Sequence, residues 1–359
     1  MYDYEDEEED MFGSPPPVRD RPEIDFKAAL NEEQFRAVTA PDGPALVLAG
    51  AGSGKTRTLT YRVAYLLSQG VSPEAILLLT FTNKAAKQML DRVEQLTGVG
   101  SHRFLGGTFH SVGGQVLRLF GDSVGLVRNF TILDDGDSDS LLNEVIRDLD
   151  PSFFKTKENP KAKPIKGLIS FARNIGSPVE DIAKGRYPAN GELLARIDSF
   201  ARAYQETKLE RGLADYDDLL VYWLEVLQNN EEAARYYQER FSHVLVDEYQ
   251  DVNSLQAGIV DKIGAKHQIM AVGDDAQSIY SFRAATIRNI LDFPEEHPDT
   301  TVVPLEQNYR STQPILEATN RVIAQASQRH TKTLWSDRTT GERPVLVNCT
   351  DEDEQSDFV

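Results

Sequence analysis

Short apolar runs alternate with amphipathic segments along most of the chain. The runs lie at residues 45–49, 75–81, 104–108, 243–246, 268–272 and 301–305. Runs this short and this apolar are typical of strands buried on both faces of a parallel sheet. After the first run, Leu59, Val63, Leu66 and Leu67 follow the spacing of one helical stripe. Strands that alternate with helices in this way predict an α/β fold with a parallel sheet.

The same pattern divides the chain into parts. Residues 1–24 are acidic and then proline-rich, which predicts a disordered tail. Helical patterns without a buried strand fill 126–213, which predicts a helical insertion that splits the α/β unit into 25–125 and 214–300. These helical patterns lie at 141–149, 165–174 and 193–209. Residues 301–359 begin another unit, with a further helix expected at 315–326.

A glycine-rich loop, AGAGSGKT, covers residues 49–56 between the first predicted strand and the first predicted helix. Glycines let successive backbone N–H groups converge on phosphate oxygens, at a helix N-terminus that favours an anion. The loop predicts a nucleotide site in which Lys55 reaches the β- and γ-phosphates and Thr56 binds Mg²⁺. Ala49 replaces the usual first glycine, and a chance glycine-rich turn is the alternative.

Two adjacent carboxylates, Asp247 and Glu248, end the strand predicted at 243–246. Neighbouring carboxylates are costly unless a cation lies between them. Asp247 is placed to hold Mg²⁺ through its water shell, and Glu248 to polarise the water that attacks the γ-phosphate. The alternative is an acidic exit from the strand.

Polar and aromatic residues follow the strand predicted at 268–272. Gln277 can sense the γ-phosphate there, and Tyr280 and Phe282 can stack on bases. Further along, Tyr309 has the chemistry of a base-stacking lid and Arg310 that of an arginine finger. Alone, the 273–283 loop is also what ordinary core and turn look like.

Two more clusters combine phenylalanine with small polar residues after the strands predicted at 75–81 and 104–108. Hydroxyl and amide side chains at helix N-termini grip a phosphodiester backbone, and exposed phenylalanine offers a stacking face. The candidates are Phe81, Asn83, Phe109 and His110. Core packing with helix capping is the alternative for each cluster, and nothing near His110 suggests a metal.

Composition then limits the classes of protein. Hydrophobic residues make up 40% and charged residues 26% of the chain, no apolar run reaches the roughly 18 residues of a membrane span, and no secretory signal is visible. Cys349 is the only cysteine, which excludes a disulfide framework and a cysteine-rich zinc site within these residues. We therefore expect a cytoplasmic protein.

The net charge of −19 argues at first against nucleic acid as a partner. Twelve of the 57 acidic residues, however, lie in the two terminal segments 1–12 and 351–357. The segment 155–173 has the opposite bias, with five lysines and Arg173 against Glu158 alone. This basic stripe can meet phosphates or be a solvated surface loop.

Taken together, the motifs resemble those of the superfamily 1 DNA helicases of the UvrD/Rep/PcrA type. They occur in the family's order: LNEEQ at 30–34, AGAGSGKT at 49–56, TFTNKAA at 80–86, GTFHS at 107–111, DEYQD at 247–251, GDDAQSIYSFR at 273–283 and NYRST at 308–312. The resemblance implies two RecA-like domains with ATP and Mg²⁺ between them, each carrying a helical insertion. It also implies a motor that walks 3′→5′ on single-stranded DNA and meets single-strand/duplex junctions. A role in repair or recombination is expected. Under this resemblance the basic stripe contacts duplex.

The resemblance also implies residue roles. Gln34 recognises the adenine edge, and Arg57 and Tyr309 enclose its ring. Glu248, Gln277 and Arg310 are catalytic, the last two through the γ-phosphate. The phosphate and metal groups are Gly50, Ala51, Gly52, Ser53, Gly54, Lys55, Thr56 and Asp247, and the single-strand track is Phe81, Asn83, Phe109, His110, Tyr280 and Phe282. The family usually has tryptophan where Phe282 stands, so this stack has less area.

The family's later motifs, including a second arginine finger, do not follow before Val359. We therefore expect the N-terminal motor part of a longer helicase, nearly inactive in isolation. One alternative is a non-catalytic module that binds nucleotide and single strand; another is the motor part of a helicase–nuclease subunit. Stimulation of ATP hydrolysis by single-stranded DNA separates the enzyme from the binder.

Overall fold

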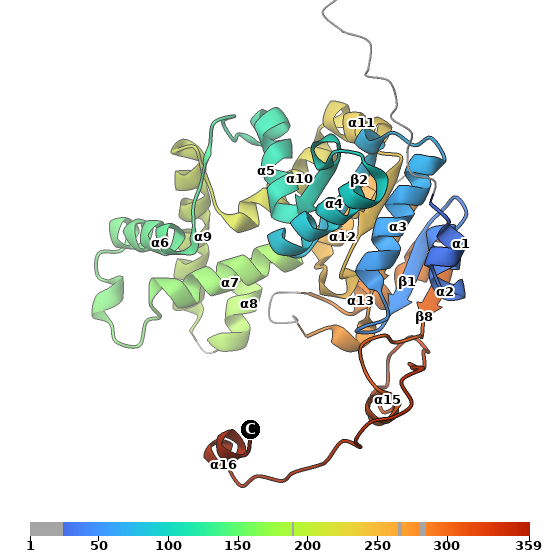
Figure 1. Ribbon diagram of the computed structural model, residues 1–359. Helices are drawn as coiled ribbons and strands as arrows, with labels where there is room; N and C mark the ends of the chain where they lie inside the picture. The colour runs from blue at the N-terminus through green and yellow to red at the C-terminus, as the bar shows by residue number, and fades with distance from the viewer. Residues whose placement is uncertain (1–23, 189, 265–267, 280–284) are drawn as a thin grey trace, which may run out of the picture.

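The computed structural model describes residues 24–188, 190–264, 268–279 and 285–359. Six of its strands form one sheet in the order β3-β2-β6-β7-β1-β8, and every pairing is parallel (Figure 1). The strands are β1 (Ala45–Ala49), β2 (Ile76–Thr80), β3 (Leu105–Thr108), β6 (His243–Val246), β7 (Gln268–Gly273) and β8 (Thr301–Leu305). The predicted α/β fold with a parallel sheet is confirmed.

Helices cover both faces of this sheet, because successive side chains of a strand point to opposite faces. Val47 and Leu78 pack in one buried cluster, and Leu46 and Leu77 pack in another. The first face is covered by α2 (Glu32–Val38), α3 (Lys55–Ser68) and α4 (Asn83–Thr97), and α1 (Phe26–Ala29) packs against α3 through Phe26. The second is covered by α5 (Phe109–Phe120), α10 (Tyr216–Asn229), α11 (Glu231–Arg240), α12 (Ser254–Gly264), α13 (Arg288–Leu291) and α14 (Phe293–Glu296).

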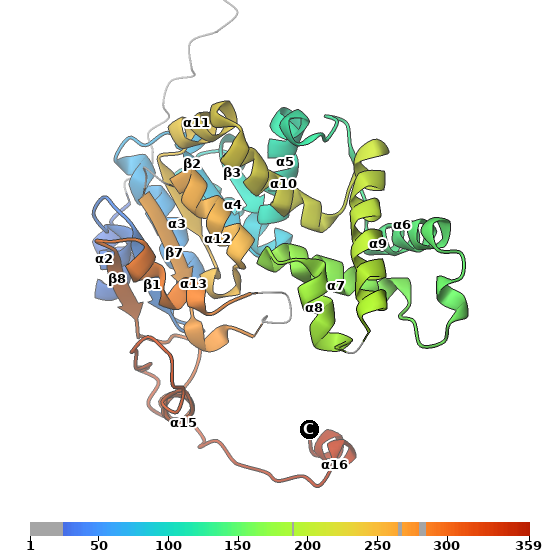
Figure 2. The same ribbon diagram turned by 180° about the vertical axis from the view of Figure 1, so that it is seen from behind.

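A separate helical unit lies beside the sheet in both views (Figures 1 and 2). It consists of α6 (Asp135–Leu149), α7 (Ala162–Ile175), α8 (Val179–Arg186) and α9 (Gly191–Glu210). These helices enclose a hydrophobic core of their own that includes Ile165 and Phe200. Two short parallel strands, β4 (Thr131–Ile132) and β5 (Leu213–Ala214), pair where the chain enters and leaves the unit. Each of the three helices expected from sequence in this region is present.

Buried charges fasten this helical unit to α10. The fully buried Nζ of Lys208 lies 2.5 Å from carboxylate oxygens of both Asp215 and Asp218, and Arg173 lies 2.9 Å from Asp218. Burial and the neighbouring Asp215 raise the pKa of Asp218 to about 6. Burial also disfavours ionisation of Asp215, but the charge and hydrogen bond of Lys208 lower its pKa to about 2. Since α7, α9 and α10 each supply a charge, the cluster fixes their relative positions.

The strand at 301–305 lies in a different sheet from the one that we expected. We assigned it to a second unit, but β8 pairs with β1 and places Val303 and Leu305 in the core of the first sheet. The first sheet therefore extends to Leu305 and not to residue 300. Beyond it the chain leaves the sheet through α15 (Gln313–Ile323) and reaches α16 (Glu352–Phe358) (Figure 1). Among the described helices, none combines the length and apolar character needed to cross a membrane.

Candidate functional site

The loop between β1 and α3 depends on its glycines. Gly52 and Gly54 have φ values of 85° and 93°, in the left-handed region that favours glycine. A Cβ on Gly52 would lie 2.6 Å from Cβ of Arg310, and a Cβ on Gly54 would lie 2.6 Å from Nε2 of Gln34. Both glycines are therefore required by conformation and by the close approach of distant segments.

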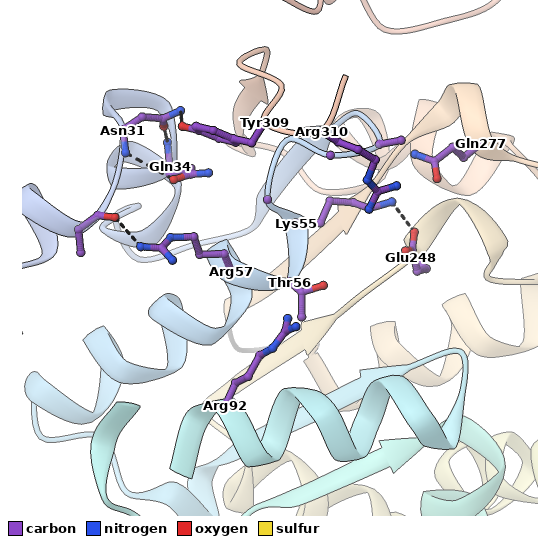
Figure 3. A pocket seen from close by; sticks show the side chains of 14 residues that line it. Asn31, Gln34, Lys55, Thr56, Arg57, Arg92, Glu248, Gln277, Tyr309 and Arg310 are labelled. Atoms are coloured by element: carbon purple, nitrogen blue, oxygen red, sulfur yellow. Dashed lines mark hydrogen bonds and ion pairs between the residues drawn. The ribbon is translucent and has the colours of Figure 1, made fainter. Parts of the chain in front are cut away.

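A cavity of about 700 Å³ lies over this loop (Figure 3). It is lined by Ala29, Asn31, Gln34, Ala51, Gly52, Gly54, Lys55, Thr56, Arg57, Arg92, Glu248, Gln277, Tyr309 and Arg310. The structure thus brings together most of the nucleotide-site residues predicted from sequence, from segments far apart in the chain. The predicted residues Gly50, Ser53 and Asp247 are buried and do not line the cavity.

Lys55 and Glu248 form an ion pair within the cavity, with 2.6 Å between Nζ and Oε2. Glu248 has a φ of 52°, which is unusual for a residue with a side chain. Gln250 donates a hydrogen bond of 2.8 Å to the same carboxylate oxygen. A strained backbone and two donors therefore hold this carboxylate at the tip of β6, as expected of a functional group.

Asp247 lies beside Glu248 at the end of the same strand. Burial, and then repulsion from Glu248, raise the pKa of Asp247 to about 6, although Lys55 opposes the shift. A carboxylate in such a place favours a nearby cation. The hydroxyl of Thr56 and this carboxylate are hard oxygen donors that suit Mg²⁺, whose remaining ligands are commonly phosphates and water. Within the described residues, no group of three or more His, Cys, Asp or Glu side chains is arranged to hold a metal.

One end of the cavity is built from aromatic and amide groups. Asn31 donates a hydrogen bond of 2.9 Å to the hydroxyl of Tyr309. Tyr309 and Arg57 lie on opposite sides of this end, with Gln34 between them (Figure 3). Gln34 Nε2 donates to the carbonyl of Ser53 over 3.0 Å, and Arg57 donates to the carbonyl of Ala29 over 2.8 Å. The ring of Tyr309 and the guanidinium of Arg57 are therefore two flat groups on either side of the cavity, next to the side-chain amide of Gln34.

The segment that follows β8 docks directly on the glycine-rich loop. Asn308 Nδ2 donates to the carbonyl of Ala51 over 2.5 Å, and the backbone N–H of Tyr309 donates to the carbonyl of Gly52 over 2.9 Å. These contacts place Arg310 above Lys55, with Gln277 beyond it at the end of the cavity away from Gln34 (Figure 3). At this end of the cavity, the cations of Lys55 and Arg310 and the amide of Gln277 therefore lie near Glu248.

Three residues that line the cavity were not predicted from sequence, namely Ala29, Asn31 and Arg92. Arg92 reaches from α4 toward Thr56 (Figure 3), and Asn31 lies within the LNEEQ motif but was given no role. The available signal for Asn31 was its place at the N-cap of α2, where its side chain accepts from the N–H of Gln34 over 2.7 Å. Arg92 gave no such signal, because an arginine on an amphipathic helix usually faces solvent.

A second cavity, of about 570 Å³, lies between the sheet and α7. Phe81, Phe109 and His110, predicted for the single-strand track, contribute to its lining. Phe171 and Tyr216 also line it and were not predicted. Tyr216 is 49% exposed, and its ring meets that of His110 edge to face with 5.7 Å between centroids. An exposed aromatic side chain thus borders a polar cavity.

The structure differs from the predicted track at Phe109. This side chain is only 3% exposed and packs against Trp223 in the main core, so it does not offer the exposed stacking face that we expected. Asn83 is exposed at the start of α4 but does not line the second cavity. Tyr280 and Phe282 lie outside the described residues.

Comparisons with known proteins agree with this geometry. Residues 30–298 match the family model of the UvrD/REP helicase N-terminal domain, and residues 303–359 match that of the UvrD-like helicase C-terminal domain. The chain is 38% identical over 334 residues to an ATP-dependent DNA helicase PcrA of Staphylococcus aureus, covering 92% of this chain and 44% of that protein. It is 39% identical over 337 residues to the PcrA of Staphylococcus epidermidis, covering 92% and 45% respectively. The chain thus spans less than half the length of these curated relatives.

Proposed function

The chain belongs to the UvrD/REP helicase family, and from this premise we propose that it is the N-terminal motor portion of an ATP-dependent DNA helicase. The observation that carries the proposal is the first cavity, where Lys55, Glu248, Gln277 and Arg310 converge over a glycine-rich loop. ATP is the proposed substrate of this cavity and Mg²⁺ its cofactor.

The cavity residues divide the work of hydrolysis. The N-terminus of α3 and Lys55 bind the phosphates, and Thr56 and Asp247 would hold Mg²⁺, which would supply further positive charge to the phosphates. Glu248 orients and polarises the attacking water, while Arg310 and Gln277 meet the γ-phosphate. Tyr309 and Arg57 enclose the adenine ring, and Gln34 reads its edge.

Arg92 adds a cation to this scheme. Its guanidinium approaches the loop from α4, on the side of Thr56 (Figure 3), where the phosphates of ATP would be within reach of its donors. Arginine suits such a site because its N–H groups bind phosphate oxygens in pairs. We therefore include Arg92 among the nucleotide-binding residues.

The second cavity is the proposed start of the single-strand track. His110 and Tyr216 offer ring faces and edges to bases, and the hydroxyl and amide groups of Ser170 and Asn174 suit the DNA backbone. Membership of the family supports movement in the 3′→5′ direction, action at single-strand/duplex junctions and a place in DNA repair or recombination.

ATP hydrolysis measured with and without single-stranded DNA tests the proposal. We expect stimulation by DNA in a protein that contains this chain together with the rest of a helicase of the relatives' length. Lys55→Ala should abolish turnover and leave single-strand affinity largely intact, because the lysine serves phosphate. Near wild-type hydrolysis by Lys55→Ala would refute the assignment of the cavity.

The 359 residues by themselves should behave differently. An arginine finger is worth roughly 10³–10⁵ in rate in related NTPases, and Arg310 is the one cation that the segment after β8 places in the cavity within the described residues. We expect this polypeptide to bind Mg·ATP weakly, to hydrolyse it orders of magnitude more slowly than the longer protein, and not to unwind duplex. A strand-displacement assay with the 359-residue polypeptide tests this expectation, and unwinding at the rate of the longer protein would contradict it.

A further inference from the structure

The segment that follows α15 crosses back to the loop after β7. The backbone N–H of His330 donates to Oδ2 of Asp275 over 3.0 Å, and its Nε2 lies 3.0 Å from the carbonyl oxygen of Ile290. Two residues on, Lys332 forms ion pairs with both Asp274 and Asp275, the first with 2.6 Å between Nζ and Oδ1. Residues 330–332 therefore tie the downstream segment to a loop that borders the nucleotide cavity.

These ion pairs are almost completely buried. The side chains of Lys332, Asp274 and Asp275 are 6%, 4% and 2% exposed. Burying one cation with two carboxylates is costly, and such an arrangement is weak evidence for a gain in stability. The contacts of Asp274 beyond Lys332 indicate a different role.

Asp274 uses its other carboxylate oxygen to hold Gln277. Nε2 of Gln277 donates to Oδ2 of Asp274 over 2.5 Å. Gln277 lines the nucleotide cavity at the end proposed for the γ-phosphate, whereas Lys332 does not line the cavity at all. A path of two contacts thus runs from Lys332 through Asp274 to the amide that faces the phosphate.

The same aspartate is also connected to the proposed base. The backbone N–H of Asp274 donates to Oε1 of Gln250 over 2.9 Å, and Nε2 of Gln250 donates to Oε2 of Glu248 over 2.8 Å. Gly273 permits this contact, since a Cβ there would lie 2.7 Å from Oε1 of Gln250. The position of Asp274 therefore affects both Gln277 and, through Gln250, Glu248.

We infer that Lys332 is a positioning residue for the nucleotide site, which holds Asp274 in place and through it orients Gln277 toward the γ-phosphate. The inference rests on the proposed function and adds a residue of the downstream segment to it. Because Gln277 lies at the γ-phosphate end, the loss of Lys332 should weaken the binding of a nucleoside triphosphate and spare the binding of the diphosphate. A residue that only supports the fold would weaken both alike.

The test compares the affinities of the chain for ADP and for a non-hydrolysable ATP analogue, each with Mg²⁺, by fluorescence titration. Lys332→Met keeps the length of the side chain and removes its charge. We expect a roughly tenfold loss of affinity for the ATP analogue, by analogy with residues that orient metal ligands, whose loss costs about 10–100-fold, and an unchanged affinity for ADP. Lys184→Met, which removes a surface lysine paired with Glu180 and Asp181, should change neither. Equal losses for both nucleotides, or no loss, would overturn the inference.

Lys332→Met leaves two buried carboxylates without a cation, so it can fail to fold. Lys332→Met combined with Asp275→Asn restores the net charge of the cluster and still removes the partner of Asp274. If the single variant unfolds, this double variant should fold and show the same selective loss of triphosphate affinity. A folded double variant with wild-type preference for the triphosphate would refute the inference.

Gln277→Ala supplies the second control. If Lys332 acts through Gln277, Lys332→Met should have no additional effect on triphosphate affinity in a Gln277→Ala background. If the fold losses of triphosphate affinity of the two single variants multiplied in the double variant, Lys332 would act by another route than Gln277. Failure of the wild-type chain to bind either nucleotide would instead refute the proposed function, so the two failures are distinguishable.

Discussion

Lys55 donates a hydrogen bond of 2.6 Å to Oε2 of Glu248, so the residue proposed to bind phosphate is paired with the proposed base. In this arrangement the two charges neutralise each other. If Lys55 binds phosphate as proposed, a phosphate in the cavity would compete with Glu248 for the lysine, and the carboxylate would then be free to orient water. Under the proposed function, the ion pair would therefore link phosphate binding to the release of Glu248 from Lys55.

Glu248→Gln separates these two roles. We expect hydrolysis to fall by about 10²–10⁴, the usual contribution of a positioned general base. ATP affinity should stay the same or rise, because a neutral amide competes less strongly for Lys55. Phosphate release and nucleotide titration measure the two effects, with the exposed Glu232→Gln on α11 as control. Wild-type hydrolysis, or a large loss of ATP affinity, would count against the proposed base.

Arg92→Met tests the cation that we add to the proposed nucleotide site. Loss of a charge-assisted hydrogen bond to phosphate costs about 1.5–3 kcal/mol, so nucleotide affinity should fall by about tenfold or more. Arg147→Met removes an exposed arginine of α6, away from the cavity, and should have no effect. Equal affinities for the two variants would return Arg92 to the solvent-exposed face of α4.

Tyr216→Ala tests the aromatic border of the second cavity. We expect single-strand affinity to fall by about 1–3 kcal/mol, the usual loss for one base–aromatic stack. Tyr216→Phe keeps the ring and should retain most of the affinity. Fluorescence anisotropy with a labelled oligonucleotide measures both variants. If the two lost affinity equally, the hydroxyl and not the ring would be the contact.

Much of the fold could be predicted because its signals are local. The strand β1 is an uninterrupted apolar run and β6 is apolar after His243, since a strand buried on both faces has mostly apolar side chains. In a parallel sheet the carboxyl ends of such strands meet at one edge. The glycine-rich loop after β1, Glu248 after β6 and Gln277 after β7 were each assigned to the phosphates of a nucleotide, and in the structure all three line one cavity.

The parts of the fold and of the site that were not predicted depend on tertiary packing, which a single sequence does not reveal. Arg92 occupies the polar face of α4, and polarity alone does not distinguish a face toward water from a face toward a cavity. Phe109 shows the same ambiguity for an aromatic residue. At the end of a strand it can stack on a base or pack in the core, and here it packs against Trp223. The strand at 301–305 was expected to begin a second unit, and it lies in the first sheet because pairing with β1, and not composition, decides which sheet includes it.

Asp218 and Asp215 share Lys208, which predicts a pH dependence of stability. The folded pKa of Asp218, about 6, exceeds its ordinary value of 3.8. The contribution of this group to the free energy of unfolding is therefore present below pH 3.8 and is lost as the pH rises through 6. The difference in unfolding free energy between wild type and Asp218→Asn should shrink by roughly 1–3 kcal/mol from pH 5 to pH 7. Urea unfolding measures it, and a difference that stays constant with pH would contradict the prediction.

The contribution of Asp215 to stability changes with pH in the opposite direction, and it does so at lower pH. Its folded pKa, about 2, lies below its ordinary value of 3.8, so its contribution is present above pH 3.8 and is lost as the pH falls through 2. Asp215→Asn keeps an N-cap for α10, because asparagine caps as well as aspartate. The advantage of wild type over this variant should therefore shrink, by about 2 kcal/mol, between pH 4 and pH 2. Asp198→Asn breaks the exposed pair with Arg202 and should show little of this trend, because exposed pairs contribute little. If both variants followed the same curve, burial beside Lys208 would not be the cause.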